Sequence, residues 1–142
     1  WQSAVSHLLN NERFPVERVV AAGKSMGGRI ASQMVAADLM AVEALIFLGY
    51  PLHPPGRTNK LRDTHLYRIK RPMLFFAGTR DPLCNMEKLQ EVFHRLPGPF
   101  KLEIVEGGDH SFKLPKSSSR SVDSVHRQIV EKCLQWLEPI AK

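Results

Sequence analysis

Apolar residues are arranged along the chain in two alternating patterns. Short continuous apolar runs, which are typical of strands covered on both faces, occur at Val19–Ala22, Ala44–Gly49 and Met73–Gly78. A fourth strand is expected at Lys101–Val105. Longer stretches repeat apolar residues at helical spacing, and these are 1–9, 30–37, 86–96 and 122–137. Strands that alternate with helices form βαβ units. We therefore expect an α/β protein, a three-layer sandwich with about four parallel strands and helices on both faces.

The segments between these elements carry turn and cap signals. Asn85 is suited to cap the helix over 86–96. Three prolines that follow the second strand exclude regular structure there, and they are Pro51, Pro54 and Pro55. Residues 56–71 are polar and irregular, with one short helix expected near their middle.

Length and composition exclude several classes of protein. The chain has 142 residues, the length of about one domain. No apolar run approaches the ~18 residues that span a bilayer, so a membrane protein is not expected. No basic and apolar leader precedes Trp1, and we expect residues 1–142 to be part of a longer chain. Cys84 and Cys133 are too few for a disulfide framework and are expected to be reduced thiols of an intracellular protein, cytoplasmic or nuclear.

Candidate chemistry begins at Gly23–Gly27, which matches the pattern G-x-S-x-G. A chain of this length meets the pattern by chance about 5% of the time, but a strand directly before it and a helix directly after it weaken that explanation. Gly23 and Gly27 are expected to allow a tight strand-to-helix turn, because side chains there would collide with neighbouring backbone. The turn would expose Ser25 as a nucleophile and aim the Met26 amide at a developing oxyanion. The alternative is a glycine-rich helix start in which Ser25 only caps the helix.

A serine hydroxyl needs a base, and two further residues occupy suitable positions. Asp81 follows the third strand and His110 follows the fourth, so both are expected at the same carboxyl edge of the sheet as Ser25. Their order along the chain, Ser, Asp, His, is the one that this architecture requires. His110 would accept the Ser25 proton, while Asp81 would orient the imidazole and stabilise its cation. Asp109 is the rival carboxylate, but its adjacency to His110 makes it a poor orienter.

The remaining histidines lack such a position and are expected to be surface or helix residues: His7, His53, His65, His94 and His126. No two histidines form a metal pair with a carboxylate at ligand spacing, and residues 23–28 lack the Lys-Ser/Thr ending of a nucleotide-binding loop. We therefore expect neither a metal nor a cofactor.

The serine turn and the turns around Asp81 and His110 together resemble those of the serine α/β-hydrolases. More narrowly, Gly23–Arg29, Leu48–Leu52 and Gly108–Phe112 resemble the KANL3/testis-expressed protein 30 type of hydrolase-like domain. The resemblance covers nearly the whole chain, and it implies a serine hydrolase that cleaves esters by acyl transfer through Ser25, Asp81 and His110. Because a larger relative serves as a subunit of a chromatin-acetylation complex, a catalytically silent scaffold that binds a protein partner is the alternative.

The resemblance also implies that residues 1–142 are the C-terminal half of an α/β-hydrolase fold, a partial domain lacking the N-terminal strands. A strand beside Val19–Ala22 and the second oxyanion amide would then be missing. Loss of one oxyanion donor costs about 3 kcal/mol of transition-state stabilisation, and an exposed strand edge invites aggregation. Residues 1–142 by themselves are therefore expected to be poorly soluble and nearly inactive.

Positive charge gathers in one connection, within a chain of net charge +6. Six basic residues and one acidic residue give this connection a local charge of +5, and they are Arg57, Lys60, Arg62, Asp63, Arg68, Lys70 and Arg71. The connection could attract an anionic substrate, an acidic protein or nucleic acid. We favour a solvated loop, because Tyr67 is the only aromatic residue beside it, and a nucleic-acid-binding module is the weakest hypothesis of function. The segment Lys116–Arg120 is expected to be a flexible polar loop.

Overall fold

The computed structural model of the protein describes residues 1–13 and 15–141. Its elements in chain order are α1 (Gln2–Leu9), β1 (Val20–Lys24), α2 (Met26–Ala36), β2 (Ala44–Leu48), the 3-10 helix η1 (Thr64–Arg68), β3 (Met73–Gly78), α3 (Met86–Phe93), β4 (Phe100–Val105) and α4 (Val122–Ala141). Every strand and helix that the apolar pattern predicts is present.

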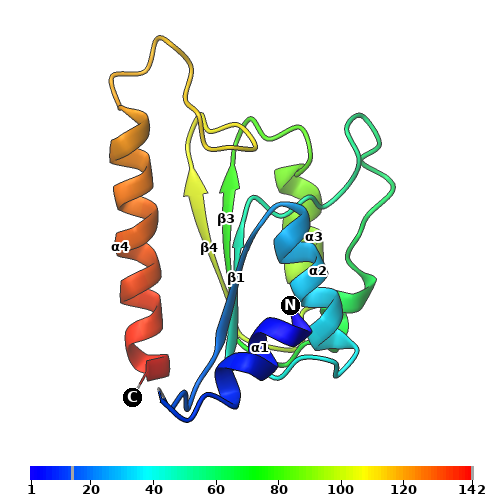
Figure 1. The fold of residues 1–142 in the computed structure, drawn as a ribbon. Coiled ribbons are helices and arrows are strands. Elements are labelled where there is room, and N and C mark those ends of the chain that lie inside the picture. The colour runs from blue at the N-terminus through cyan, green and yellow to red at the C-terminus, as the bar shows by residue number, and fades with distance from the viewer. Residues whose placement is uncertain (14, 142) are drawn as a thin grey trace.

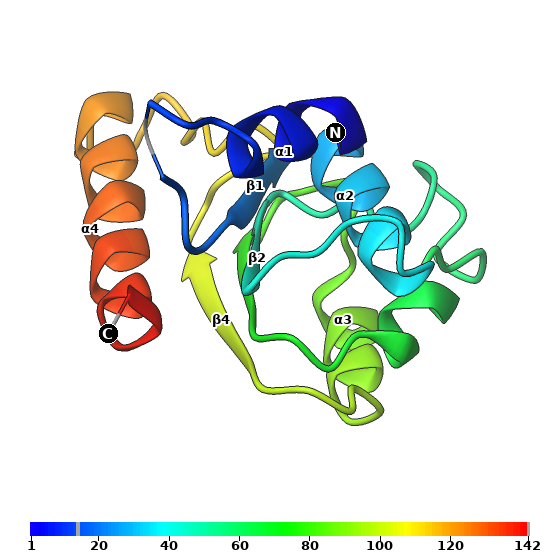
Figure 2. The same ribbon diagram turned by 60° about the horizontal axis from the view of Figure 1, so that its bottom comes forward.

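The four strands form one parallel sheet in the order β1-β2-β3-β4. Helices α2 and α3 cover one face of this sheet and α4 covers the other (Figures 1 and 2). The predicted α/β class and three-layer arrangement are therefore confirmed. Because all strands run in the same direction, their carboxyl ends meet at one edge, where the loops that carry the candidate residues emerge.

The core is divided between the two faces of the sheet. Leu45 and Phe47 contribute to the cluster under α2 and α3, whereas Ile46 contributes to the cluster under α4. Successive side chains of a strand point to opposite faces, so a strand that is covered on both faces must be apolar at every position. This explains why the central strands are continuous apolar runs.

Several boundaries differ from the predicted ones by a few residues. Helix α3 ends at Phe93 rather than near residue 96, because Leu96 precedes Pro97 and a residue before proline disfavours the helical conformation. The first strand continues to Lys24, directly before the serine. The Asn85 cap is confirmed, since its side chain accepts a hydrogen bond from the Lys88 amide at 2.9 Å.

Strand β1 has a partner on one side only within residues 1–13 and 15–141. Ala22 and Lys24 on this strand are exposed. Among the described helices, none combines the length and the apolar character that crossing a bilayer requires.

Candidate active site

Ser25 lies at the turn between β1 and α2 in a strained backbone conformation. Its φ of 51° and ψ of −123° place a non-glycine residue in the positive-φ region, which costs on the order of 1–3 kcal/mol. The Ser25 amide donates to the Leu48 carbonyl at 3.1 Å, and the Arg29 amide donates back to the Ser25 carbonyl at 3.2 Å. The Ser25 hydroxyl makes no capping hydrogen bond to the helix. The alternative reading of Ser25 as a mere helix cap is therefore wrong.

Close backbone contact explains one of the two glycines in the motif. A Cβ atom on Gly23 would lie 2.3 Å from the backbone nitrogen of Gly28, so no side chain fits at Gly23. For Gly27 the prediction is wrong, because a Cβ atom there would lie within 4 Å of no other described residue outside its own stretch of helix. Gly28 makes the second close approach instead, with a Cβ position 2.7 Å from the Gly23 carbonyl oxygen. The turn of the helix directs position 28, rather than position 27, against β1.

This difference gives a matched pair of variants. Gly23→Ala is expected to lower the free energy of unfolding by about 3 kcal/mol, because the added methyl group must displace backbone rather than a flexible side chain. Gly27→Ala is expected to leave stability unchanged or to raise it slightly, since alanine favours helix more than glycine does. Urea denaturation of both variants measures the difference, and equal losses of stability would contradict this assignment of close contacts.

His110 connects the serine to the acid. Nδ1 of His110 lies 2.8 Å from Oδ2 of Asp81, and its Nε2 lies 2.7 Å from Oγ of Ser25. An ionised carboxylate only accepts hydrogen bonds, so Nδ1 carries the imidazole proton and Nε2 is left to accept the Ser25 hydroxyl hydrogen. The structure thus brings together the three residues that the sequence predicts, in an arrangement that can move a proton from Ser25 to His110.

Both oxygens of the Asp81 carboxylate have hydrogen-bond partners. Its side chain is fully buried, while that of His110 is 20% exposed. Oδ1 of Asp81 accepts the Leu83 amide at 2.8 Å, which leaves Oδ2 for the imidazole. Nearby, burial raises the pKa of the Cys84 thiol to about 12, and the Asp81 carboxylate adds to this rise. Cys84 therefore stays a neutral thiol near pH 7 and does not compete as a nucleophile.

Asp109 shapes the loop that presents His110. Its Oδ1 accepts the amides of Ser111 at 2.7 Å and Lys113 at 3.0 Å. Burial opposes ionisation of this carboxyl, but the hydrogen bonds from the two amides and the charges of Lys113 and Arg80 together outweigh burial and lower the pKa of Asp109. Asp109 is therefore occupied within its own loop, in agreement with its expected unsuitability as the orienter of His110.

His53 corrects a prediction, because it is a buried residue of a loop and not a surface or helix residue. It is 2% exposed, and its Nε2 accepts the Asn85 amide at 2.9 Å. Its Nδ1 must then carry the proton and donate to the Pro54 carbonyl, also at 2.9 Å. His53 thereby joins the loop after β2 to the loop that carries Asp81. Its position in a proline-rich loop gave no sequence signal for this role.

A second polar cluster surrounds the half-buried His65, where α2 packs against η1. The hydroxyl of Ser32 donates to the Arg29 carbonyl and that of Tyr50 donates to the Arg62 carbonyl, each at 2.7 Å. Since both hydroxyl hydrogens are used, Nε2 of His65 carries a proton and donates to Oγ of Ser32 at 2.8 Å. Burial, and then the charge of Arg29, lower the pKa of His65. His65 is therefore neutral in the fold near pH 7.

The lowered pKa of His65 predicts a pH dependence of stability. Below pH 6.5 the unfolded chain protonates His65 while the folded chain does not, so the unfolded state binds more protons. The free energy of unfolding is expected to fall as the pH drops from 6.5 toward the lowered pKa. His65→Gln keeps a donor near Ser32 but cannot titrate, so its stability should fall less between pH 7 and pH 5. Identical slopes for the two proteins in urea titrations would contradict this interpretation.

The amide of Met26 is the first of α2 and has no acceptor within the helix. It is adjacent to Ser25 and can donate to negative charge that develops on a carbonyl oxygen attacked by the serine. In the described part of the chain, no three His, Cys, Asp or Glu side chains are grouped so as to hold a metal ion.

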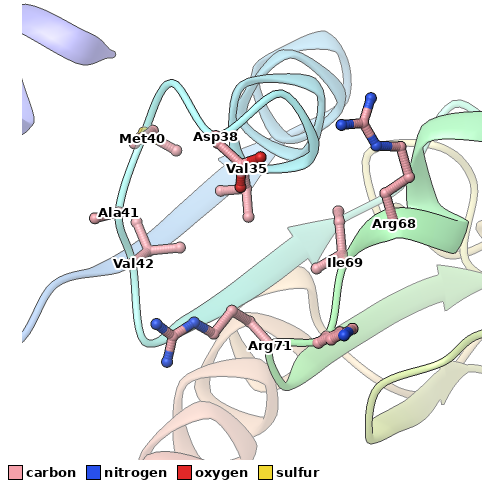
Figure 3. Close-up of a pocket in the computed structure, with 9 residues that line it drawn as sticks. Val35, Asp38, Met40, Ala41, Val42, Arg68, Ile69 and Arg71 are labelled. Carbon is pink, nitrogen blue, oxygen red and sulfur yellow. The ribbon is translucent and has the colours of Figure 1, made fainter.

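The basic connection does not form one patch beside these residues. Arg57 and Lys60 lie in the loop after β2, whereas Arg68 and Arg71 border a hollow of about 420 Å³ at the amino end of the sheet. Figure 3 shows Arg71 extending toward Val42, and its guanidinium pairs with Glu43 at 3.2 Å. The segment thus runs from the carboxyl ends of the strands to their amino ends. Only its first part lies near the carboxyl ends.

A parallel sheet with a strained serine turn and an Asp–His pair at its carboxyl edge defines the class of α/β-hydrolases. A family model described as an alpha/beta hydrolase domain matches residues 1–138. The chain therefore belongs to this family.

Solved structures with a similar fold include those of three proteins that are named as enzymes. An esterase from Pyrococcus furiosus is 16% identical, with a TM-score of 0.72 over 97% of this chain and 59% of that chain. The esterase domain of a Rhodothermus marinus protein is 18% identical, with a TM-score of 0.65 over 96% and 65%. A dienelactone hydrolase from Anabaena variabilis is 21% identical, with a TM-score of 0.66 over 92% and 55%. The likeness concerns the fold, and this chain spans less than two thirds of the length of each of the three.

Proposed function

We propose that the protein is a serine hydrolase that cleaves carboxylic esters through an acyl-enzyme on Ser25. The observation that carries this proposal is the unbroken line of hydrogen bonds from Ser25 through His110 to Asp81, with heavy-atom distances of 2.7 and 2.8 Å. Membership of the alpha/beta hydrolase domain family and the esterase neighbours support the same chemistry.

In the proposed reaction, the Ser25 oxygen attacks the ester carbonyl as its proton passes to Nε2 of His110. The Met26 amide donates to the oxyanion, and the Asp81 carboxylate stabilises the imidazolium. His110 then returns the proton to the departing alcohol, which leaves the acyl group on Ser25. A water molecule, deprotonated by His110, hydrolyses this intermediate and restores the serine.

We further propose that a strand outside residues 1–142 pairs with the open edge of β1 in the active protein and that a second oxyanion donor comes with it. The unpartnered edge and the exposed Ala22 support this view, as does the partial coverage of the esterase structures. The narrower assignment to the KANL3/testis-expressed protein 30 type of domain is a proposal on the motif residues alone. An intracellular location and a protein partner are proposals of the same kind.

The silent-scaffold alternative is not favoured, since Ser25, His110 and Asp81 are already joined by hydrogen bonds.

Hydrolysis of p-nitrophenyl butyrate tests the proposed function. The protein should carry whatever natural residues flank positions 1–142. The expected result is turnover by the protein and none by His110→Gln. This variant should still melt cooperatively. A well-folded protein without turnover on any short-chain ester would contradict the proposal.

A further inference from the structure

Arg29 contains an unsatisfied donor. Within residues 1–13 and 15–141, its Nε is the one buried side-chain nitrogen or oxygen that lacks a hydrogen-bond partner. Buried donors without partners are rare in folded proteins and call for an explanation, such as a ligand that supplies the acceptor. The whole Arg29 guanidinium takes part in no ion pair of the described residues.

Arg29 is placed one helical turn beyond the serine. Ser25, Arg29 and Ser32 are spaced by four and three residues, so they lie along one face of α2. At a rise of ~1.5 Å per residue, Arg29 lies about 6 Å from Ser25 along the helix axis. The same face meets the Tyr50–His65 segment, where the charge of Arg29 acts on both of these residues.

Within residues 1–13 and 15–141, no side chain supplies an anion to this guanidinium. Asp63 belongs to the same neighbourhood, but its carboxylate is taken by Arg95 at 3.2 Å and by the Tyr67 hydroxyl. His65 is neutral, so it offers no negative charge to Arg29, and no hydrogen bond joins its ring to the Arg29 Nε. The N-terminus of α2 carries the partial positive charge of the helix dipole, and the Arg29 guanidinium is also positive. The guanidinium is therefore unfavourable near this helix end unless an anion compensates both positive charges.

We propose that Arg29 binds a carboxylate carried by the acyl group of the substrate, so that the enzyme prefers monoesters of short dicarboxylic acids. This inference rests on the proposed function and names its substrate class. A guanidinium can hold a carboxylate with two parallel hydrogen bonds, and Nε is one of the donors in that geometry. Because Arg29 is one helical turn beyond Ser25, the proposal specifies short acyl groups, of succinate to glutarate length.

Paired substrates test the proposal kinetically. The ratio of kcat/KM for the p-nitrophenyl monoester of succinate to that for p-nitrophenyl butyrate is expected to fall by about 10- to 100-fold in Arg29→Gln. Arg29→Lys keeps the charge but not the paired donors, so it should give an intermediate ratio. Arg57→Gln is the matched control, since Arg57 is an exposed arginine in the loop after β2, and it should leave the ratio unchanged. An unchanged ratio in Arg29→Gln, or an equal fall in Arg57→Gln, would overturn the proposal.

Binding of succinate separates this inference from the proposed function. Succinate should raise the melting temperature of the protein and of Arg57→Gln, but not that of Arg29→Gln. If succinate binds in this way while no ester is cleaved, the site stands and the proposed hydrolysis fails. If esters are cleaved and succinate has no effect that depends on Arg29, the hydrolase stands and this inference fails.

Discussion

Ser25→Ala is expected to lower kcat for ester hydrolysis by about 10⁶-fold, the scale seen when the nucleophile of a working triad is removed. The loss is large because no acyl-enzyme can form without the serine oxygen, so the water step that His110 also assists has no intermediate to act on. The fold should survive, since among the described residues the Ser25 hydroxyl forms a hydrogen bond with His110 alone. Initial rates with p-nitrophenyl butyrate measure the effect.

Ser6→Ala serves as the control for this loss, because Ser6 is an exposed serine on α1. It should retain full activity. Residual activity in Ser25→Ala within tenfold of the parent protein would mean that the hydrolysis proceeds through another residue.

Asp81→Asn is expected to lower kcat by about 10⁴-fold, the scale known for this change in a Ser-His-Asp triad. An asparagine amide can donate to Nδ1 of His110, which would move the imidazole proton to Nε2. Nε2 could then no longer accept the Ser25 proton. Comparison of the steady-state kcat of the parent protein with that of the variant, both at pH 8, measures this loss.

Asp109→Asn provides the matched comparison. The asparagine oxygen can still accept the amides of Ser111 and Lys113, so the His110 loop should keep its shape and kcat should stay within about tenfold. If the two variants lost activity equally, or if Asp109→Asn lost more, the carboxylate that orients His110 would be Asp109 and the assignment of Asp81 would be wrong.

The sequence predicted the fold well because the sheet is covered on both faces. The covering helices require strands without polar positions, and runs such as Ala44–Leu48 are unambiguous for that reason. The meeting of Ser25, Asp81 and His110 was also predictable, since the ends of parallel strands share one edge. The positions of these three residues depend on the order and direction of the strands, and the local apolar patterns are sufficient to predict both.

Contacts that depend on tertiary neighbours were not predictable from local patterns. The close approach to β1 belongs to Gly28 and not to Gly27, because the rotation of α2 about its own axis decides which glycine faces the strand. His53 carries no motif, and its burial follows from the packing of two loops after separate strands. The unsatisfied donor of Arg29 becomes visible only when the acceptors around it have been assigned to other groups.

Covalent labelling tests most directly whether Ser25 is an activated nucleophile. The protein is treated with a fluorophosphonate, digested and mapped by mass spectrometry, beside His110→Gln under the same conditions. The expected result is one adduct, on Ser25, which forms in the parent protein and is absent from the variant. A folded protein that stays unlabelled, or an adduct on Ser25 that forms equally fast without His110, would contradict the triad.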